Sequence, residues 1–117
     1  MDFVKPILGE RVFQKHTNSA FIGTLLESIL RQEKIHTLAI VGITVDHCVS
    51  TTARMAANLG FEVIIVADAT IALERVGFDG TRFSAELVHA VTLASLHKEF
   101  ATILTTNNLI ESMLSTT

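Results

Sequence analysis

The sequence predicts a single α/β domain over residues 1–117, with a parallel β-sheet at its centre. Short apolar runs alternate along the chain with longer segments of helical periodicity, which is the pattern of βαβ units with right-handed crossovers. The run Glu62–Val66 is apolar after its first residue, so both faces of this strand are expected to be covered. Hydrophobic residues make up 49% of the chain, which is enough to form a core.

The first third of the chain is predicted to contain one short strand and one helix. Pro6 and Gly9 interrupt regular structure near the start, and Arg11–Gln14 is predicted to be a brief strand that ends at Lys15. After a polar loop, apolar residues recur at helical spacing and predict an amphipathic helix over Gly23–Arg31. The apolar residues with this spacing are Ile22, Leu25, Leu26, Ile29 and Leu30.

A buried strand and a helix flank the one cysteine of the chain. Thr37–Val41 is predicted to be the strand, and Cys48–Leu59 is predicted to be the helix, which ends at Gly60, a typical C′ residue. Small side chains on one face of this helix allow it to lie close to a sheet. That face consists of Val49, Ala53, Ala56 and Leu59.

The second half of the chain is predicted to add two strands and a long helix. Glu62–Val66 is the next strand, and Asp68–Gly80 is predicted to be a loop with a turn at Asp79–Gly80. The remaining predicted elements are a helix from Thr81 or Ser84 to about Lys98, a strand over Ala101–Leu104 and a helical turn over Leu109–Leu114.

Charge and composition exclude several classes of protein. The net charge is −3 and the nine Lys and Arg residues are scattered, so no surface for nucleic acid is expected. No apolar run approaches the ~18 residues of a membrane span, and the first residues do not resemble a signal peptide. A lone cysteine cannot form an internal disulfide. We therefore expect a cytoplasmic protein that binds no membrane.

Cys48 is the residue with the clearest chemical potential, because it lies where a strand gives way to a helix. The unpaired N–H groups and the dipole of a helix N-terminus favour a thiolate there. Lys15, the segment Gly42–Cys48 and Asp68 each follow a predicted strand, so they are expected to converge at one edge of the sheet. The alternative is that Cys48 is a small buried apolar residue.

Several motifs resemble the isochorismatase-like cysteine hydrolases, the superfamily that includes nicotinamidases and N-carbamoylsarcosine amidohydrolases. The resemblance covers nearly the whole chain and implies a three-layer α/β/α fold with a Rossmann-like parallel sheet, truncated here to about four strands. The motifs are Lys-His-Thr-Asn-Ser-Ala-Phe-Ile-Gly-Thr (15–24), Gly-Ile-Thr-Val-Asp-His-Cys-Val (42–49), Thr-Ala-Arg-Met-Ala (52–56), Leu-Gly-Phe-Glu-Val (59–63) and Val-Ala-Asp-Ala (66–69).

The resemblance implies specific roles for residues around Cys48. Cys48 would be the nucleophile that forms an acyl-enzyme, and Lys15 would be the charged partner of its thiolate. A cis peptide bond between Ile43 and Thr44 would turn the Thr44 N–H toward the Cys48 N–H, so that both donate to the oxyanion. The substrate would be a small amide or ureido compound whose C–N bond is cleaved.

The sequence departs from the family pattern at its start. The third member of the family's catalytic triad is an Asp on an upstream strand, but this chain begins only fourteen residues before Lys15, and Asp2 is not assigned that role. We therefore expect the C-terminal two thirds of the family fold, without its first two strands, with weakened hydrolysis. The metal ligands of nicotinamidases lie in the same upstream region, so no metal and no cofactor are expected.

The missing strands are expected to leave an open sheet edge beside Thr37–Val41. Such an edge favours pairing with another chain, so a homo-oligomer is expected. Arg11–Gln14 should either lie beside Leu38–Val41 or remain loosely held.

Other residues near the predicted site have two interpretations each. Asp46 is interpreted as a helix N-cap rather than a catalytic base, and Asp68 as a residue that caps a loop. His47 and Phe21 are candidates to line the substrate pocket. The alternatives are that His47 packs on its neighbours and that Phe21 belongs to the core.

Two further functions compete with the hydrolase. The chain could be a non-catalytic remnant of the same fold that acts as an oligomerising module. A thiol redox sensor is the third possibility, although the chain has no second cysteine to resolve a sulfenic acid.

Overall fold

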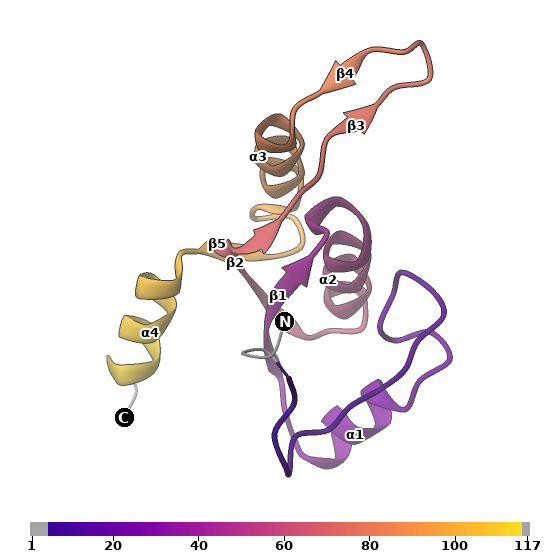
Figure 1. The fold of residues 1–117 in the computed structure, drawn as a ribbon. Helices are drawn as coiled ribbons and strands as arrows, with labels where there is room; N and C mark the ends of the chain where they lie inside the picture. Colours follow the sequence, from indigo (N-terminus) through magenta and orange to yellow (C-terminus); the bar gives the residue numbers. More distant parts are fainter. Residues whose placement is uncertain (1–4, 116–117) are drawn as a thin grey trace.

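In the computed structural model, which describes residues 5–115, a three-stranded parallel sheet forms the centre of the molecule (Figure 1). Its strands are β1 (Thr37–Ile43), β2 (Glu62–Ile71) and β5 (Thr102–Leu104), in the order β1–β2–β5. Both neighbouring pairs are parallel. The predicted α/β class with a parallel sheet is therefore confirmed, with three strands in the described sheet instead of about four.

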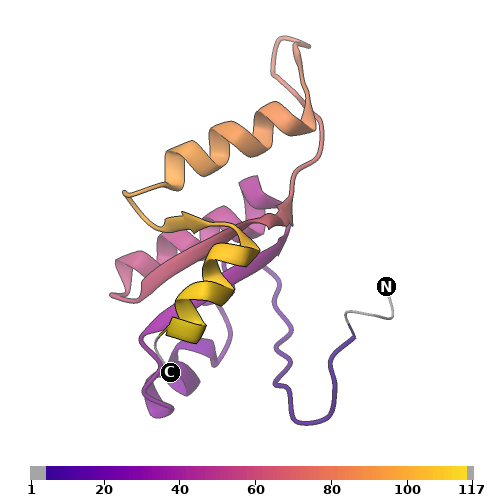
Figure 2. The ribbon, with the colours of Figure 1, turned by 90° about the vertical axis from the view of Figure 1, so that its left-hand side faces the viewer.

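Helices lie on both sides of this sheet. In Figure 1, α2 and α4 lie on opposite sides of β2, and Figure 2 shows α4 in front of the sheet and α2 behind it. The helical elements are α1 (Leu26–Gln32), the π-helical turn η2 (Val45–Val49), α2 (Ser50–Asn58), α3 (Ala85–Leu96) and α4 (Thr106–Ser115). None of the helices within residues 5–115 has both the length and the apolar character needed to cross a membrane.

The core forms where η2, α2 and α3 meet β2. Val45, Ile65 and Leu96, one from each of η2, β2 and α3, are completely buried. Ala53 and Ala56 of α2 are also completely buried, so the small face predicted for this helix does pack closely in the core. Burial of these side chains holds η2, and with it Cys48, against the sheet.

The loop predicted over Asp68–Gly80 is partly wrong: the turn at Asp79–Gly80 is present, but strands occupy two parts of the segment. β2 continues to Ile71, with an irregular register that opposes Ile40 to Ile65 but Gly42 to Thr70. The chain then forms an antiparallel hairpin from β3 (Arg75–Val76) and β4 (Arg82–Phe83), which projects from the body of the molecule (Figure 1). The hairpin was missed because its strands have two residues each and no alternating pattern.

Asp68 does not cap a loop in this structure. It lies in the irregular part of β2, and its Oδ1 accepts hydrogen bonds from the N–H (2.8 Å) and hydroxyl (2.9 Å) of Thr106 at the start of α4. These bonds satisfy a donor at a helix N-terminus and lower the pKa of Asp68.

The strand predicted over Arg11–Gln14 is also wrong. These residues have no regular structure, and the side chain of Arg11 pairs with Glu33 after α1. A strand requires a neighbour that accepts its hydrogen bonds, and within the described sheet β1 pairs with β2 only, so its other edge is open. Of the two predicted alternatives, the loosely held segment matches the structure. Asp2 lies outside the described residues.

Candidate active site

Cys48 lies in η2, directly after β1, and its sulfur contacts two side chains from a distant loop. Lys15 Nζ lies 3.4 Å from Cys48 Sγ, and Asn18 Oδ1 lies 3.4 Å from the same sulfur. Cys48 is half-buried rather than enclosed in apolar packing, so the buried-cysteine alternative does not describe its position. The predicted convergence of Lys15 and Cys48 is therefore present in the structure. Asp68, the third residue expected at this edge, is not a partner of the sulfur and bonds Thr106 instead.

The ammonium of Lys15 is held in place by three acceptors. Besides the sulfur, Nζ donates to the carbonyl oxygens of Thr17 (2.7 Å) and Asn18 (3.2 Å). An ammonium has three N–H groups and each has a partner here, which fixes the charge beside the sulfur.

The loop that carries Lys15 is attached to α2 through Thr52. The Ala20 N–H donates to Thr52 Oγ1 (3.0 Å), and this hydroxyl donates to the Asn18 carbonyl (3.4 Å). Thr52 is 8% exposed, and both contacts are partly buried. Thr52 and Asn18 are site residues that the sequence did not reveal, although both lie in motifs of the family resemblance.

A cavity of about 250 Å³ lies beside Cys48, at the end of β1. It is lined by Lys15, Ala20, Ile40, Val41, Gly42, Ile43, Cys48, Val49 and Thr52. Gly42 has a φ of +136°, and a Cβ placed there would come no closer than 3.9 Å to Val49. The backbone conformation, and not a lack of space, therefore favours glycine at this position.

The predicted oxyanion donors lie at Thr44, the residue between β1 and η2, and at Cys48 within η2. The Ile43–Thr44 peptide bond is cis. Thr44 is the residue before η2, but its side chain does not cap the turn. Its hydroxyl instead accepts a hydrogen bond from Arg75 Nη2 at 3.3 Å.

Asp46 is not an N-cap, which corrects the interpretation made from the sequence. Its carboxylate receives Arg75 Nε at Oδ2 (2.7 Å) and Arg75 Nη2 at Oδ1 (3.2 Å), a bidentate ion pair. These hydrogen bonds hold the pKa of Asp46 below its usual value. Sequence analysis missed Arg75 because it lies in a segment predicted to be a loop, with no motif around it.

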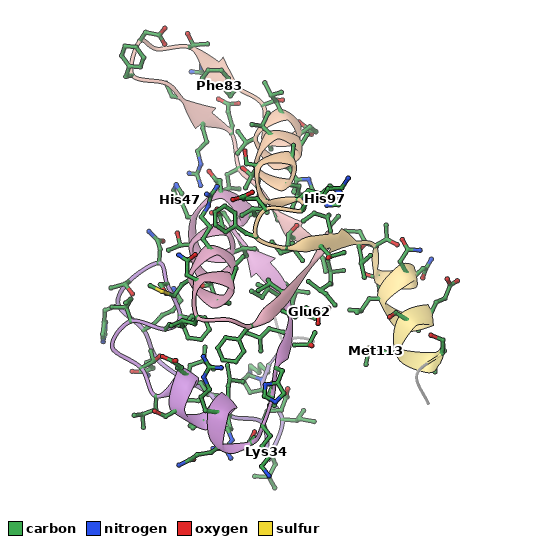
Figure 3. All side chains as sticks on the ribbon, turned by 180° about the vertical axis from the view of Figure 1, so that it is seen from behind. Lys34, His47, Glu62, Phe83, His97 and Met113 are labelled. Atoms are coloured by element: carbon green, nitrogen blue, oxygen red, sulfur yellow. The ribbon has the colours of Figure 1, made fainter. Side chains whose placement is uncertain are left out.

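The two candidate pocket residues lie elsewhere. Phe21 stacks on the buried Phe61, with ring centroids 6.0 Å apart, so its position matches the core alternative. His47 is exposed, and its Nδ1 lies 3.3 Å from Arg75 Nη2. Figure 3 shows His47 on the side of the molecule from which the hairpin that carries Phe83 projects.

No group of His, Cys, Asp and Glu residues within residues 5–115 is arranged to hold a metal ion. The hydrogen-bond partners of the Cys48 sulfur in this part of the chain are Lys15 and Asn18. The carboxylate two residues before it belongs to Asp46 and is occupied by Arg75. The site as described thus combines a thiol, an ammonium and an amide.

Comparison with protein families and curated proteins shows one consistent similarity. The family model described as Isochorismatase domain matches residues 1–108. The chain is 46% identical over 115 residues to the uncharacterized isochorismatase family protein YrdC of Bacillus subtilis. The matched region is 98% of this chain and 62% of YrdC.

Two curated relatives with lower coverage have named reactions. Ureidoacrylate amidohydrolase RutB of Serratia proteamaculans is 39% identical over 70 residues, which is 60% of this chain and 28% of RutB. N-carbamoylsarcosine amidase of Arthrobacter is 42% identical over 64 residues, which is 55% of this chain and 24% of that enzyme.

Solved structures show the same similarity in three dimensions. An isochorismatase-family protein from Chromobacterium violaceum superposes with a TM-score of 0.93 and 38% identity, covering 96% of this chain and 58% of that one. A cysteine hydrolase from Pseudomonas syringae has a TM-score of 0.95 and 25% identity, covering 100% of this chain and 55% of that one. The chain therefore spans little more than half the length of these structures.

The lowered pKa of Asp46 predicts how acid affects stability. Because the folded-state pKa lies below the unfolded value, the ion pair stabilises the fold above about pH 4, and this contribution is lost as pH falls through the folded-state pKa. Asp46→Asn should cost about 1–2 kcal/mol of unfolding free energy near pH 7 and much less near pH 3, measured by urea unfolding.

The exposed Glu111 on α4 provides the control for this prediction. Glu111→Gln should leave the unfolding free energy within about 0.5 kcal/mol at both pH values. An Asp46→Asn penalty that stays the same in acid would show that the ion pair does not contribute through its charge.

Proposed function

The chain belongs to the isochorismatase family, and we propose that it is a cysteine hydrolase that cleaves a C–N bond of a small amide or ureido compound through an acyl-enzyme on Cys48. The observation that carries this proposal is the 3.4 Å contact between Lys15 Nζ and Cys48 Sγ, beside a cavity. A thiolate is the nucleophilic form of cysteine, and an adjacent ammonium stabilises it.

In the proposed first step, the Cys48 thiolate attacks the carbonyl carbon of the substrate. The S–C bond forms, the C–N bond breaks, and the amine or ammonia leaves with a proton taken from the surrounding water. The N–H groups of Thr44 and Cys48 are proposed to stabilise the negative oxygen of the tetrahedral intermediate.

In the second step, water attacks the thioester, releasing the acid and restoring the thiol. A general base that activates this water is worth about 10²–10⁴ in rate. Within residues 5–115 no carboxylate hydrogen-bonds the sulfur.

The substrate class rests on the cavity and on the named relatives. A cavity of about 250 Å³ suits a small molecule, and its one charged lining residue is Lys15. Two relatives are named as amidohydrolase and amidase of ureido or carbamoyl compounds. These features support a small carbonyl compound with a C–N bond as the substrate.

Incubation with a panel of small amides and ureido compounds should place an acyl group on Cys48, because the sulfur is half-buried beside the cavity and next to an ammonium. Mass spectrometry of the intact protein and of its peptides detects the adduct, and release of ammonia reports turnover. Cys48→Ala should form no adduct. Folded protein that gives neither an adduct nor ammonia with any compound would refute the hydrolase.

The contact between Lys15 and Cys48 predicts faster reaction of the thiol. Lys15→Met should slow alkylation of Cys48 by iodoacetamide about tenfold near neutral pH, because a hydrogen bond to a charged group is worth about 1.5–3 kcal/mol. Lys34→Met, which removes an exposed lysine after α1, is the matched control. Equal rates for the two variants would mean that Lys15 does not stabilise the thiolate.

A second candidate function, assembly into homo-oligomers, is favoured by apolar side chains that the described chain leaves exposed. Phe78 at the hairpin tip is fully exposed, and Val76, Leu87 and Val91 on the hairpin and α3 are about half exposed. An apolar hollow of about 420 Å³ lies between the hairpin and α3. Exposed apolar surface of this kind is typical of a protein interface.

If the chain forms homo-oligomers, size-exclusion chromatography with light scattering should give a molar mass larger than that of one chain. Val91→Asp on α3 should shift the protein toward the monomer, because a charge buried in an apolar interface is costly. Ile110→Asp on α4, where the native side chain is similarly exposed, should not. A wild-type monomer at micromolar concentration would exclude the assembly function.

A further inference from the structure

Arg75 on the hairpin contacts three residues of the turn that leads to Cys48. Its guanidinium donates from Nε and Nη2 to the two carboxylate oxygens of Asp46, at 2.7 and 3.2 Å. Nη2 also donates to Thr44 Oγ1 at 3.3 Å and lies 3.3 Å from His47 Nδ1. One side chain from β3 therefore joins Thr44, Asp46 and His47.

These contacts are partly enclosed and geometrically specific. The Asp46 side chain is 16% exposed and that of Arg75 is 32% exposed, so solvent screens the pair less than it screens a surface pair. A planar guanidinium that meets a carboxylate with two hydrogen bonds also fixes the orientation of both groups. The pair thus restrains the direction of the turn and not only its charge.

The turn has few other restraints from side chains. The Thr44 side chain does not cap η2, and the backbone bonds at the start of η2 run from the N–H groups of His47 and Val49 to the Thr44 carbonyl, each at 3.3 Å. The Thr44 hydroxyl, which would otherwise be available as a cap, accepts from Arg75. Arg75 therefore adds a side-chain restraint from a distant element to the local interaction between the Thr44 and Asp46 side chains.

Arg75 does not contact the sulfur of Cys48, whose partners in the described chain are Lys15 and Asn18. An effect of Arg75 on chemistry must therefore pass through the turn. The groups with a proposed role are the N–H group of Thr44 at the start of this turn and that of Cys48, the residue directly after it. Their effect on rate depends strongly on position, because donors for an oxyanion must lie about 2.7–3.1 Å from it.

We propose that Arg75 is a positioning residue that holds the Thr44–His47 turn so that the N–H groups of Thr44 and Cys48 meet the oxyanion of the acyl-transfer step. This inference rests on the function proposed above and adds the hairpin to the site. It separates two parts of the chemistry. Lys15 supports the thiolate, whereas Arg75 supports the donors to the oxyanion.

Two reagents that modify Cys48 distinguish these parts. With p-nitrophenyl acetate, the sulfur forms a bond to the acetyl carbon, the tetrahedral intermediate carries an oxyanion, and p-nitrophenolate leaves. With iodoacetamide, the sulfur displaces iodide from a CH₂ group and no oxyanion forms. Acylation therefore requires the donors of the turn, but alkylation requires only an accessible thiolate.

Stopped-flow rates of both reactions on the full chain test the proposal. Arg75→Ala should slow acylation of Cys48 about 10- to 100-fold and change alkylation by less than about threefold, because small misplacements of donors have large effects on rate. Arg75→Lys should recover part of the acylation rate, since a lysine retains one hydrogen bond but not the bidentate pair.

Arg82 on β4 is the matched control, because it lies on the same hairpin, pairs with Glu74 at 3.0 Å and is 76% exposed. Cys48 of the Arg82→Ala variant should be acylated and alkylated at the wild-type rates. Asp46→Asn should also slow acylation selectively, and the double variant with Arg75→Ala should be no slower than the more affected single variant. Asp46→Asn tests the proposal independently if circular dichroism shows that Arg75→Ala is poorly folded.

The outcomes separate this proposal from the proposed function. Wild-type protein that is not acylated at Cys48 would overturn the function and the role of Arg75 together. If the wild type is acylated but Arg75→Ala reacts at the same rate, only the role of Arg75 is overturned. An equal fall in acylation and alkylation would also overturn it, because Arg75 would then act on the thiol or on the fold.

Discussion

The contact between the Lys15 ammonium and the Cys48 sulfur is the interaction on which the site depends, and it is made by segments 33 residues apart. Two independent supports bring them together. Burial of Val45 and Val49 holds η2 in the core, and Thr52 of α2 attaches the loop that carries Lys15. Because α2 follows η2 directly, Cys48 and the loop that carries Lys15 are fixed to the same helical segment.

The site is also connected to the hairpin, through the residues that precede Cys48. Arg75 reaches from β3 to Asp46 and Thr44, whereas Lys15 and Asn18 approach the sulfur itself. The hairpin projects from the body and carries exposed apolar side chains at Val76 and Phe78 (Figure 1). The hairpin therefore carries both exposed apolar side chains and the arginine that we propose as a restraint on the oxyanion donors.

Sequence periodicity predicted the elements that bury a regular face. The helices around Ser50–Asn58 and Ala85–Leu96 and the strands around Thr37–Ile43 and Glu62–Ile71 were found for this reason, within a few residues at their ends. The strand predicted over Arg11–Gln14 did not form, because a strand depends on a neighbour that local sequence does not specify. The hairpin was missed because two-residue strands have no periodicity.

For the site, the sequence alone determined that the one cysteine lies where a strand gives way to a helix and that Lys15 is the first residue of the 15–24 motif. Those are local features, set by periodicity and by motif. The strand before the cysteine was predicted to be buried, which is wrong, because every residue of β1 is exposed or half-exposed at the open edge of the sheet. The tertiary structure decided the rest: that Asn18 meets the sulfur, that Thr52 anchors the loop, and that Asp46 pairs with Arg75 instead of capping a helix. Such pairs depend on which side chains the fold brings within hydrogen-bond distance, and no spacing along the chain encodes that distance.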